Sequence, residues 1–297
     1  MLVELFAVMA PVLIVAGIGY GWARSGQPYP TDFVTRLVLN ISTPCLVLST
    51  LSRAEVDLSV FGQMAAACVV ISVLMALIGW GLSRAMGSDP RVLVPAYMFP
   101  NTGNMGLPIS LYAFGEAGLA LAVAFFVVLS VGHFSVGLIL SGAAQSWRRL
   151  LLNPVIISLC VALAVLLLDL ELPRWIDNTV GLLGAMSIPM MLLTLGVSLA
   201  SIRLKQVGRG MWLGGLRMLC GAAIGWVIAL ALDLPPLAQA VLVMQSAMPV
   251  AVFNYLFAVR AGRSPETVAS LVICSTLLSF LFIPLLLLWW LPASGQG

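Results

Sequence analysis

Charged side chains are scarce in this sequence, and their scarcity excludes several classes of protein. Aspartate, glutamate, lysine and arginine together account for 8% of the 297 residues, whereas 61% are hydrophobic. Soluble globular domains contain about 25% charged residues, so a soluble fold is excluded. The formal net charge of +3 is small and spread along the chain, which excludes the concentrated basic surface that binds nucleic acid. The composition predicts an integral protein of the lipid bilayer.

Cysteine is sparse as well, and the five cysteines stand apart in apolar stretches. Their spacing forms neither a disulfide framework nor a zinc motif. We interpret them as small buried hydrophobic residues and predict no metal site and no cofactor. Near the N-terminus, Glu4 stands where a signal peptide carries basic residues, and the apolar run 5–22 is longer than a signal-peptide core. That run is therefore predicted to be retained as a first membrane span.

Charges, glycines and prolines divide the rest of the chain into apolar stretches that are long enough to cross a bilayer, which takes roughly 20 residues. There are ten stretches: 3–23, 33–52, 58–83, 92–114, 117–141, 153–170, 175–201, 210–232, 236–259 and 266–291. The sequence thus predicts an all-α polytopic membrane protein with ten transmembrane helices.

The cationic residues predict how these helices are oriented, because cytoplasmic loops retain lysine and arginine. Arg53 and Arg174 fall in loops after even-numbered stretches, and Arg36 and Arg217 lie within stretches. The remaining cations, in loops after odd-numbered stretches, are Arg24, Arg84, Arg91, Arg148, Arg149, Arg203, Lys205, Arg209, Arg260 and Arg263. Both termini are therefore predicted to lie on the non-cytoplasmic side.

Prolines indicate an internal repeat, a common feature of transporters. Three pairs recur at nearly equal offsets of 143, 145 and 141 residues: Pro11 with Pro154, Pro44 with Pro189, and Pro108 with Pro249. The offsets predict a five-helix repeat over 1–145, a basic cytoplasmic link over 146–152 and a second repeat over 153–297. Since five is odd, the second copy enters the membrane in the opposite sense, which makes a 5+5 inverted repeat.

The fourth and ninth stretches contain residues that interrupt a helix. The fourth carries, at its middle, Pro100, Asn101, Thr102, Gly103, Asn104, Gly106 and Pro108; the ninth carries Gln245, Ser246, Pro249 and Asn254. Proline removes a backbone donor and glycine lets the chain turn. Unwound backbone within a membrane must be buried in protein or line a wet cavity. We therefore predict that helices 4 and 9 are broken and cross at a cavity near the midplane.

Broken helices present free N–H groups at their half-helix N-termini, and these attract anions. The neutral side chains of Asn101, Thr102, Asn104, Gln245 and Ser246 would add hydrogen bonds to a carboxylate. With Pro108, Pro249 and Asn254, they form the predicted substrate site for a small organic anion. The alternative at this stage is a pair of proline kinks, stabilised by local amides, in a channel or an inert bundle.

These segments also resemble a known family. The run 101–108, followed by Gly115 and Glu116, resembles the first crossover of the auxin efflux carrier family, and 247–251 with 275–279 and Pro284 resembles the second. The resemblance implies a fold related to bile-acid symporters and sodium/proton antiporters. It implies a scaffold of spans 1, 2, 6 and 7, a mobile transport domain of spans 3–5 and 8–10, elevator-type alternating access and a homodimer. Family members carry auxin and, in bacteria, dicarboxylates such as malonate or malate. The short link 146–152 resembles that of compact bacterial members, which implies the bacterial inner (plasma) membrane.

Groups that would couple transport to an ion are few. Every acidic residue stands at or near a predicted helix end, whereas a sodium or proton carrier commonly has an intramembrane acid. Coupling therefore uses neutral oxygens or is absent. His133 is interpreted either as a proton switch or as a neutral, hydrogen-bonded core residue. Arg217 is interpreted either as a snorkelling side chain or as part of a cationic wall that attracts anions.

The resulting prediction is a secondary active transporter of small organic anions. A sodium-coupled symporter of the bile-acid type and a passive anion channel remain as alternatives. An intramembrane hydrolase is the rival from another class, since Gly132, His133, Ser135 and Gly137 superficially resemble a nucleophile motif. The spacing is G-x-x-S-x-G instead of G-x-S-x-G, and residues two apart on a helix face different directions. No enzymatic activity is predicted.

Overall fold

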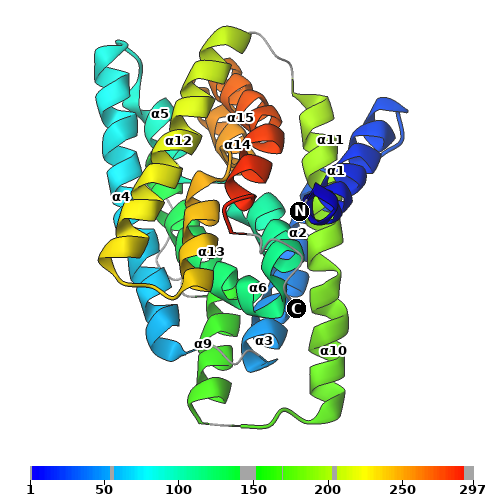
Figure 1. Cartoon of the computed structure of the whole chain (residues 1–297). Coiled ribbons are helices and arrows are strands. Elements are labelled where there is room, and N and C mark those ends of the chain that lie inside the picture. Colours follow the sequence, from blue (N-terminus) through cyan, green and yellow to red (C-terminus); the bar gives the residue numbers. More distant parts are fainter. Residues whose placement is uncertain (1, 54–56, 141–151, 169, 203–205, 291–297) are drawn as a thin grey trace.

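The structure, a computed structural model, describes residues 2–53, 57–140, 152–168, 170–202 and 206–290. Within these ranges the regular elements are helices (Figure 1), and one isolated antiparallel bridge pairs Pro100 with Val250. The first half contains α1 (Leu2–Arg24), α2 (Thr31–Leu37), the π-helical turn η1 (Val38–Ser42), α3 (Thr43–Arg53), α4 (Leu58–Ala85), α5 (Pro90–Met98), the π-helical turn η2 (Thr102–Gly106), α6 (Leu107–Gly132), η3 (His133–Gly137) and α7 (Leu138–Leu140). The second half contains α9 (Pro154–Leu167), α10 (Arg174–Ala185), α11 (Ser187–Ser201), α12 (Val207–Ala231), α13 (Pro236–Ala247), α14 (Val252–Ala261) and α15 (Pro265–Leu287).

The predicted all-helical membrane character is confirmed. Seven helices in the described part of the chain are long and apolar enough to cross a membrane: Val3–Arg24, Thr31–Arg53, Leu58–Ala85, Thr102–Gly137, Arg174–Ser201, Val207–Ala231 and Pro265–Leu287. Two shorter apolar helices, α9 and α14, accompany them. On α4, Val69, Val73, Leu77 and Trp80 follow one another at helical spacing and are exposed, which suits a face that contacts lipid.

Seven long helices differ from the ten predicted stretches at three places. The helix 102–137 runs through the end of the fourth stretch and most of the fifth, interrupted at Gly115, whose φ of 66° and ψ of −162° are not helical. A positive φ is accessible to glycine because it has no Cβ. The ninth stretch is divided between α13 and α14, and the sixth is a helix of 14 residues. Most of the predicted link 146–152, with Arg148 and Arg149, lies outside the described residues, as do Arg203 and Lys205.

The helices pack in two groups that draw elements from both halves of the chain. In the first group, α1 packs against α11, and α3 packs against α9 and α10. In the second, α4 packs against α5 and α6, α12 against α13 and α15, and α14 against α15. Figure 1 shows α1, α10 and α11 on the right and α4, α5 and α12 on the left. Helix α6 contacts α1 and α3, and η2 contacts α11, so these elements join the two groups.

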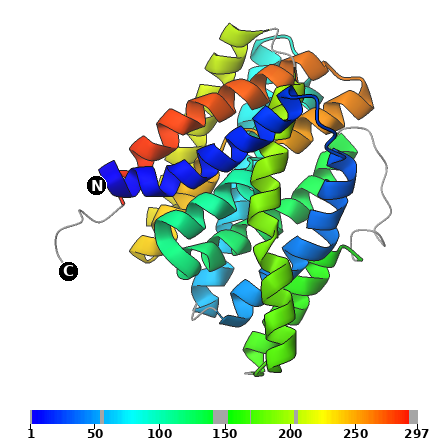
Figure 2. The ribbon, with the colours of Figure 1, turned by 90° about the vertical axis from the view of Figure 1, so that its right-hand side faces the viewer.

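Small residues let α1 and α11 approach closely. A Cβ at Gly196 would overlap the backbone of Ala16 and Tyr20, and a Cβ at Gly19 would overlap the backbone of Leu193. Glycine at such positions permits close helix packing in membranes. Figure 2 shows α1 in dark blue running across the green helix α11. The close approach gives the first group a firmly packed pair of helices on one side of the site described below.

Candidate functional site

Both segments that were predicted to break do so. The helix α5 ends at Met98 and η2 begins at Thr102, while α13 ends at Ala247 and α14 begins at Val252. We call residues 99–101 the first break and residues 248–251 the second break. Each break leaves backbone groups without partners in its own helix, so their partners must come from elsewhere.

The two breaks lie side by side and supply each other's partners. The backbone N–H of Asn101 donates to the carbonyl of Pro249 at 2.7 Å. In the reverse direction, the N–H of Ala251 donates to the carbonyl of Phe99 at 3.2 Å. Because an unpaired backbone group within a bilayer costs several kcal/mol, this exchange stabilises both interruptions at once.

Pro100 and Pro108 take different places relative to the second break. The antiparallel bridge joins Pro100 to Val250, so the proline of the first break that faces the second break is Pro100. Pro108 lies in α6, two residues after the end of η2, and takes no part in the bridge. The sequence pattern treated both prolines as helix breakers, whereas only tertiary contacts distinguish them.

A neutral amide completes the first break. The side chain Nδ2 of Asn254, in α14, donates to the carbonyl of Phe99 at 3.0 Å. Because that amide nitrogen is a donor, Oδ1 of Asn254 is the acceptor for Nε2–H of His133 at 3.1 Å. The His133 ring stacks on Phe99 with centroids 4.4 Å apart and meets the edge of Phe257. His133 is thus buried in an aromatic setting and joins α6–η3 to α14.

A cation and a hydroxyl complete the second break. Nη1 of Arg217, in α12, donates to the carbonyl of Ser246 at 2.9 Å and to the carbonyl of Met248. The N–H of Val250 donates to Oγ of Ser275 at 3.0 Å. Arg217 is only 1% exposed, so its side chain does not snorkel to the membrane surface, and it lines neither of the two cavities described below.

Gln245 and Ser246 are buried between helices. Nε2 of Gln245 donates to Oγ of Ser110 in α6 at 3.0 Å, and the Gln245 amide lies directly on Gly106. Oε1 of Gln245 is buried and has no partner in the described part of the chain. The hydroxyl of Ser246 donates to the carbonyl of Leu242 within its own helix. In this conformation both side chains, which were predicted to bind substrate, form hydrogen bonds within the protein: Gln245 with α6 and Ser246 with its own helix.

Asn101, Thr102 and Asn104 line a small cavity of about 40 Å³ beside the first break. The wall also includes His133 and Phe253. The first residues of η2 and of α14 thus reach the same space. Nδ2 of Asn101 is buried and has no hydrogen-bond partner among the described residues. Asn254, predicted as part of the site, accepts a hydrogen bond from His133 and so helps to hold His133 in the wall of this cavity.

Sequence reasoning missed part of the lining of the small cavity. Leu39 of η1 and Met191 of α11 belong to the first group of helices, whereas Phe126 and Ser130 of α6 belong to the second. These residues lie in the second, fifth and seventh predicted stretches, outside the two interrupted segments from which the site was predicted. The cavity is therefore bounded by both groups.

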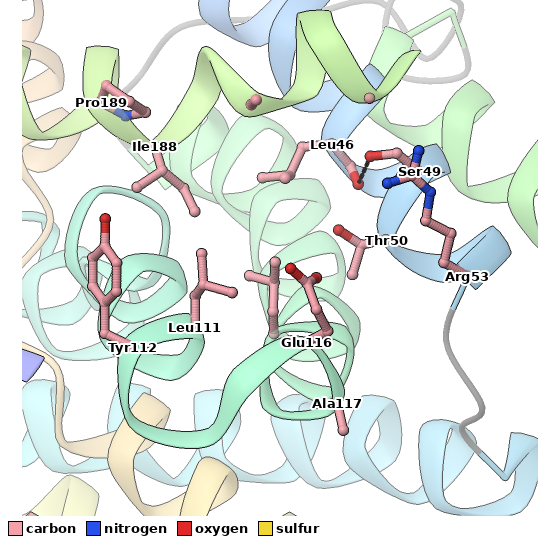
Figure 3. A pocket seen from close by; sticks show the side chains of 13 residues that line it. Leu46, Ser49, Thr50, Arg53, Leu111, Tyr112, Glu116, Ala117, Ile188 and Pro189 are labelled. Atoms are coloured by element: carbon pink, nitrogen blue, oxygen red, sulfur yellow. Dashed lines mark hydrogen bonds between the residues drawn. The ribbon is translucent and has the colours of Figure 1, made fainter. Parts of the chain in front are cut away.

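A larger cavity of about 630 Å³ lies between α3, α6, α10 and α11 (Figure 3). Ser49, Thr50 and Arg53 enter it from α3, and Tyr112 and Glu116 from α6 on either side of the non-helical Gly115. Figure 3 shows the carboxylate of Glu116 pointing into the cavity. The only sequence signal for this region was the Gly115–Glu116 pair within the family resemblance.

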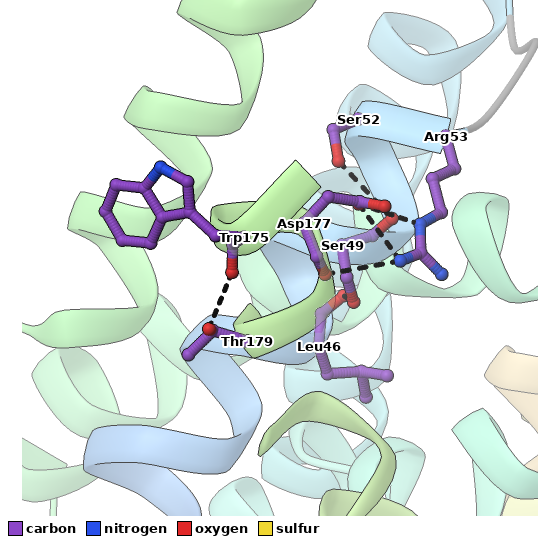
Figure 4. A network of polar contacts seen from close by, with 7 residues as sticks. All are labelled: Leu46, Ser49, Ser52, Arg53, Trp175, Asp177 and Thr179. Atoms are coloured by element: carbon purple, nitrogen blue, oxygen red, sulfur yellow. Dashed lines mark hydrogen bonds and ion pairs between the residues drawn. The ribbon is translucent and has the colours of Figure 1, made fainter. Parts of the chain in front are cut away.

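Arg53, which lines the larger cavity, forms an ion pair with Asp177 (Figure 4). Arg53 donates from Nε to Oδ1 of Asp177 at 3.0 Å and from Nη2 to the Asp177 carbonyl at 3.3 Å, which ties α3 to α10. The Arg53 side chain is 54% exposed, and exposed pairs of this kind contribute little to stability. The ion pair therefore fixes the position of the Arg53 side chain beside the larger cavity, and it contributes little to the stability of the fold.

Known proteins resemble this chain along most of its length. A family model described as a membrane transport protein matches residues 5–146 and 137–287. An "Uncharacterized transporter" of Methanothermobacter thermautotrophicus is 27% identical over 288 residues, which is 92% of this chain and 94% of the relative. "Uncharacterized transporter MJ1031" of Methanocaldococcus jannaschii is 23% identical, covering 92% and 95% of the two chains.

The name of a third relative includes a substrate. The protein named "Putative malonate transporter" in Rhizobium meliloti is 23% identical over 223 residues, 69% of each chain. The family model and the relatives are all transporters, and together they cover the two breaks and both cavities. The chain therefore belongs to this family of membrane transport proteins, the auxin efflux carrier family that its motifs resemble, and is a transporter and not an enzyme.

Proposed function

We propose that this protein is a secondary active transporter of small organic anions, with carboxylates as its substrate class. The observation that carries the proposal is the convergence of two helix N-termini, those of η2 and α14, on one small cavity that also holds the unpartnered amide of Asn101. Helix N-termini favour anions through their free N–H groups and their partial positive charge. The relative named for malonate transport supports a dicarboxylate.

The size of the small cavity supports alternating access. At about 40 Å³ it has room for only a few water molecules, since each takes roughly 10–15 Å³ of such volume. An organic anion therefore requires that the cavity widen, and its wall contains residues of both helix groups. We propose that the group of α4–α6 and α12–α15 moves as an elevator against the group of α1–α3 and α9–α11, with the larger cavity as the non-cytoplasmic entrance.

The proposed architecture keeps ten spans. The ten apolar stretches form two inverted five-span repeats, in which the two breaks are equivalent and spans 4 and 9 cross. The orientation of the cationic loops places both termini on the non-cytoplasmic side, and the family resemblance supports a homodimer in a bacterial inner membrane. The pairing of the two breaks supports the equivalence of spans 4 and 9.

A thermal-shift screen of the purified protein against malonate and other carboxylates, with and without sodium between pH 5 and 8, tests the substrate class. Malonate is expected to raise the melting temperature of the wild type. Asn104→Ala is expected to abolish that shift without altering the unliganded melting temperature, because Asn104 lines the cavity. Asn178→Ala, an exposed asparagine on α10, is the matched control and is expected to keep the shift. An unchanged malonate response in Asn104→Ala would remove that residue from the site.

Reconstituted protein separates a carrier from a passive channel. Uptake of labelled malonate into proteoliposomes is expected to saturate and to accelerate when unlabelled malonate is loaded inside, because a carrier returns faster when it is occupied. Uptake without such acceleration would identify a channel, and sodium-dependent uptake would identify a sodium symporter.

A further inference from the structure

Arg217 lies on a part of α12 where two glycines allow this helix to pack closely against the second break. Gly221 and Gly225, on the same helix, lie against the backbone and side chain of Ser246, where a Cβ would overlap them. The backbone of α12 therefore packs directly on the end of α13. This contact brings the guanidinium of Arg217 to the carbonyls of Ser246 and Met248 without any intervening side chain.

The groups that Arg217 contacts are those that attract cations. The last carbonyls of a helix have no partners in the helix, and together they carry about half a negative charge. Ser246 belongs to the last turn of α13, and Met248 is the first residue of the break. In transporters with broken helices, unwound carbonyls and half-helix C-termini of this kind coordinate sodium or protons.

A donor does not need a positive charge to form a hydrogen bond with a carbonyl of a break. At the first break a neutral amide, that of Asn254, performs the equivalent task at the carbonyl of Phe99. Within the described residues the hydrogen bonds of Arg217 go to two carbonyl oxygens and not to a carboxylate. A fully buried cation without an acidic partner is costly, so the charge itself is what Arg217 adds at this position.

We propose that the guanidinium of Arg217 permanently occupies the place at the second break that a coupling cation takes in ion-driven carriers. This inference rests on the proposed carrier function. Its consequence is that the protein binds its anion without sodium. It also follows that removing the guanidinium exposes two carbonyl oxygens and the end of α13 as a site for a small monovalent cation such as sodium or guanidinium.

The melting temperature of the full-length protein in detergent tests the inference without any substrate. Wild type, Arg217→Ala, Arg217→Met and Arg217→Lys are each measured in sodium, potassium, choline and dilute guanidinium chloride at equal ionic strength. Arg217→Ala is expected to melt several degrees below wild type in choline and to regain most of that loss in sodium or guanidinium. Arg217→Met fills the space with an apolar chain and is expected to stay low in every salt. Wild type and Arg217→Lys are expected to show no response specific to sodium.

Malonate supplies the second readout. The malonate shift of the wild type is expected to be equal in sodium and choline, and that of Arg217→Ala is expected to appear only in sodium or guanidinium. A sodium requirement in the wild type, a sodium response gained by Arg217→Lys, or an Arg217→Ala protein that ignores every cation would each overturn the inference. If Arg217→Ala does not fold, the wild-type and Arg217→Lys measurements still decide. A wild type that responds to no carboxylate contradicts the proposed function, while the salt effect on Arg217→Ala still tests the cation site.

Discussion

The two helix breaks face each other, yet different chemistry holds them. At the first break, the neutral amide of Asn254 from α14 donates to the backbone, His133 of η3 bonds that amide, and a cavity lies alongside. At the second, a buried cation and a hydroxyl complete the backbone. Met248 and Val250 there are completely buried. The comparison shows that the amide of Asn101, which lacks a partner among the described residues, lies at the first break, whereas a buried cation holds the second; residues of both breaks line the small cavity.

The largest expected effect tests the rigidity of the second break. In Gly221→Ala, the new Cβ would overlap the carbonyl of Ser246 and lie 3.4 Å from Nη1 of Arg217. Backbone cannot move aside as a side chain can, so we expect a loss of about 3 kcal/mol in the free energy of unfolding. Denaturant or thermal melts of the purified protein measure it.

Gly208→Ala is the matched control for that substitution. Gly208 lies on the same helix, and its Cβ would meet no atom of the described residues within 4 Å. We expect its stability to stay the same or rise by less than about 1 kcal/mol, because alanine favours the helix. Equal losses in the two variants would contradict a rigid contact between α12 and the second break.

A smaller effect is expected at the first break. Asn254→Ala removes the donor to Phe99 and the acceptor for His133, but the carbonyl of Phe99 keeps the N–H of Ala251. We expect a loss of about 1.5 kcal/mol in the free energy of unfolding, together with a weaker malonate shift because His133 lines the small cavity. Asn40→Ala, at an exposed asparagine, controls for the substitution. A loss as large as that of Gly221→Ala would remove the contrast between the breaks.

Gly106→Ala sharpens the comparison, because its new Cβ would overlap a side chain instead of backbone. The amide of Gln245 lies directly on Gly106 and can rotate away, so we expect a loss of about 1 kcal/mol. The double variant Gly106→Ala/Gln245→Ala is expected to lose less than the sum of the two single variants, since it relieves the overlap. Additive losses would show that the two residues do not press on each other.

The smallest effect concerns pH. Because His133 donates from Nε2 to Asn254 and is surrounded by aromatic rings, we expect His133→Gln, which keeps a donor, to transport with an unaltered pH profile. Uptake into proteoliposomes between pH 5 and 8 measures it. A displaced profile would instead make His133 a proton-coupling residue, the other interpretation that its position in the sequence allowed.

Local features of the sequence predicted much of the fold and less of the site. Hydropathy identified the apolar helices, and the clusters around Pro100 and Pro249 identified where two of them are interrupted, because proline and glycine act on the backbone at their own positions. The same reasoning matched Pro108 with Pro249 in the internal repeat, and it did not show that Pro100 is the proline that faces the second break. It also assigned Gln245 and Ser246 to the substrate site, which stays a prediction; in the structure both side chains are buried, with hydrogen bonds to Ser110 and to the carbonyl of Leu242.

Composition and proline placement alone determined that this chain lies in a membrane, that it is helical, and that two of its helices break near polar residues. Each of these properties depends on a residue and its immediate neighbours along the chain. Only the tertiary structure decided that Arg217 meets the carbonyls of the second break and that Asn254 reaches Phe99, 155 residues away in the chain. Such contacts depend on how helices from the two halves pack together, because a buried polar group takes whichever partner the packing brings within hydrogen-bond distance.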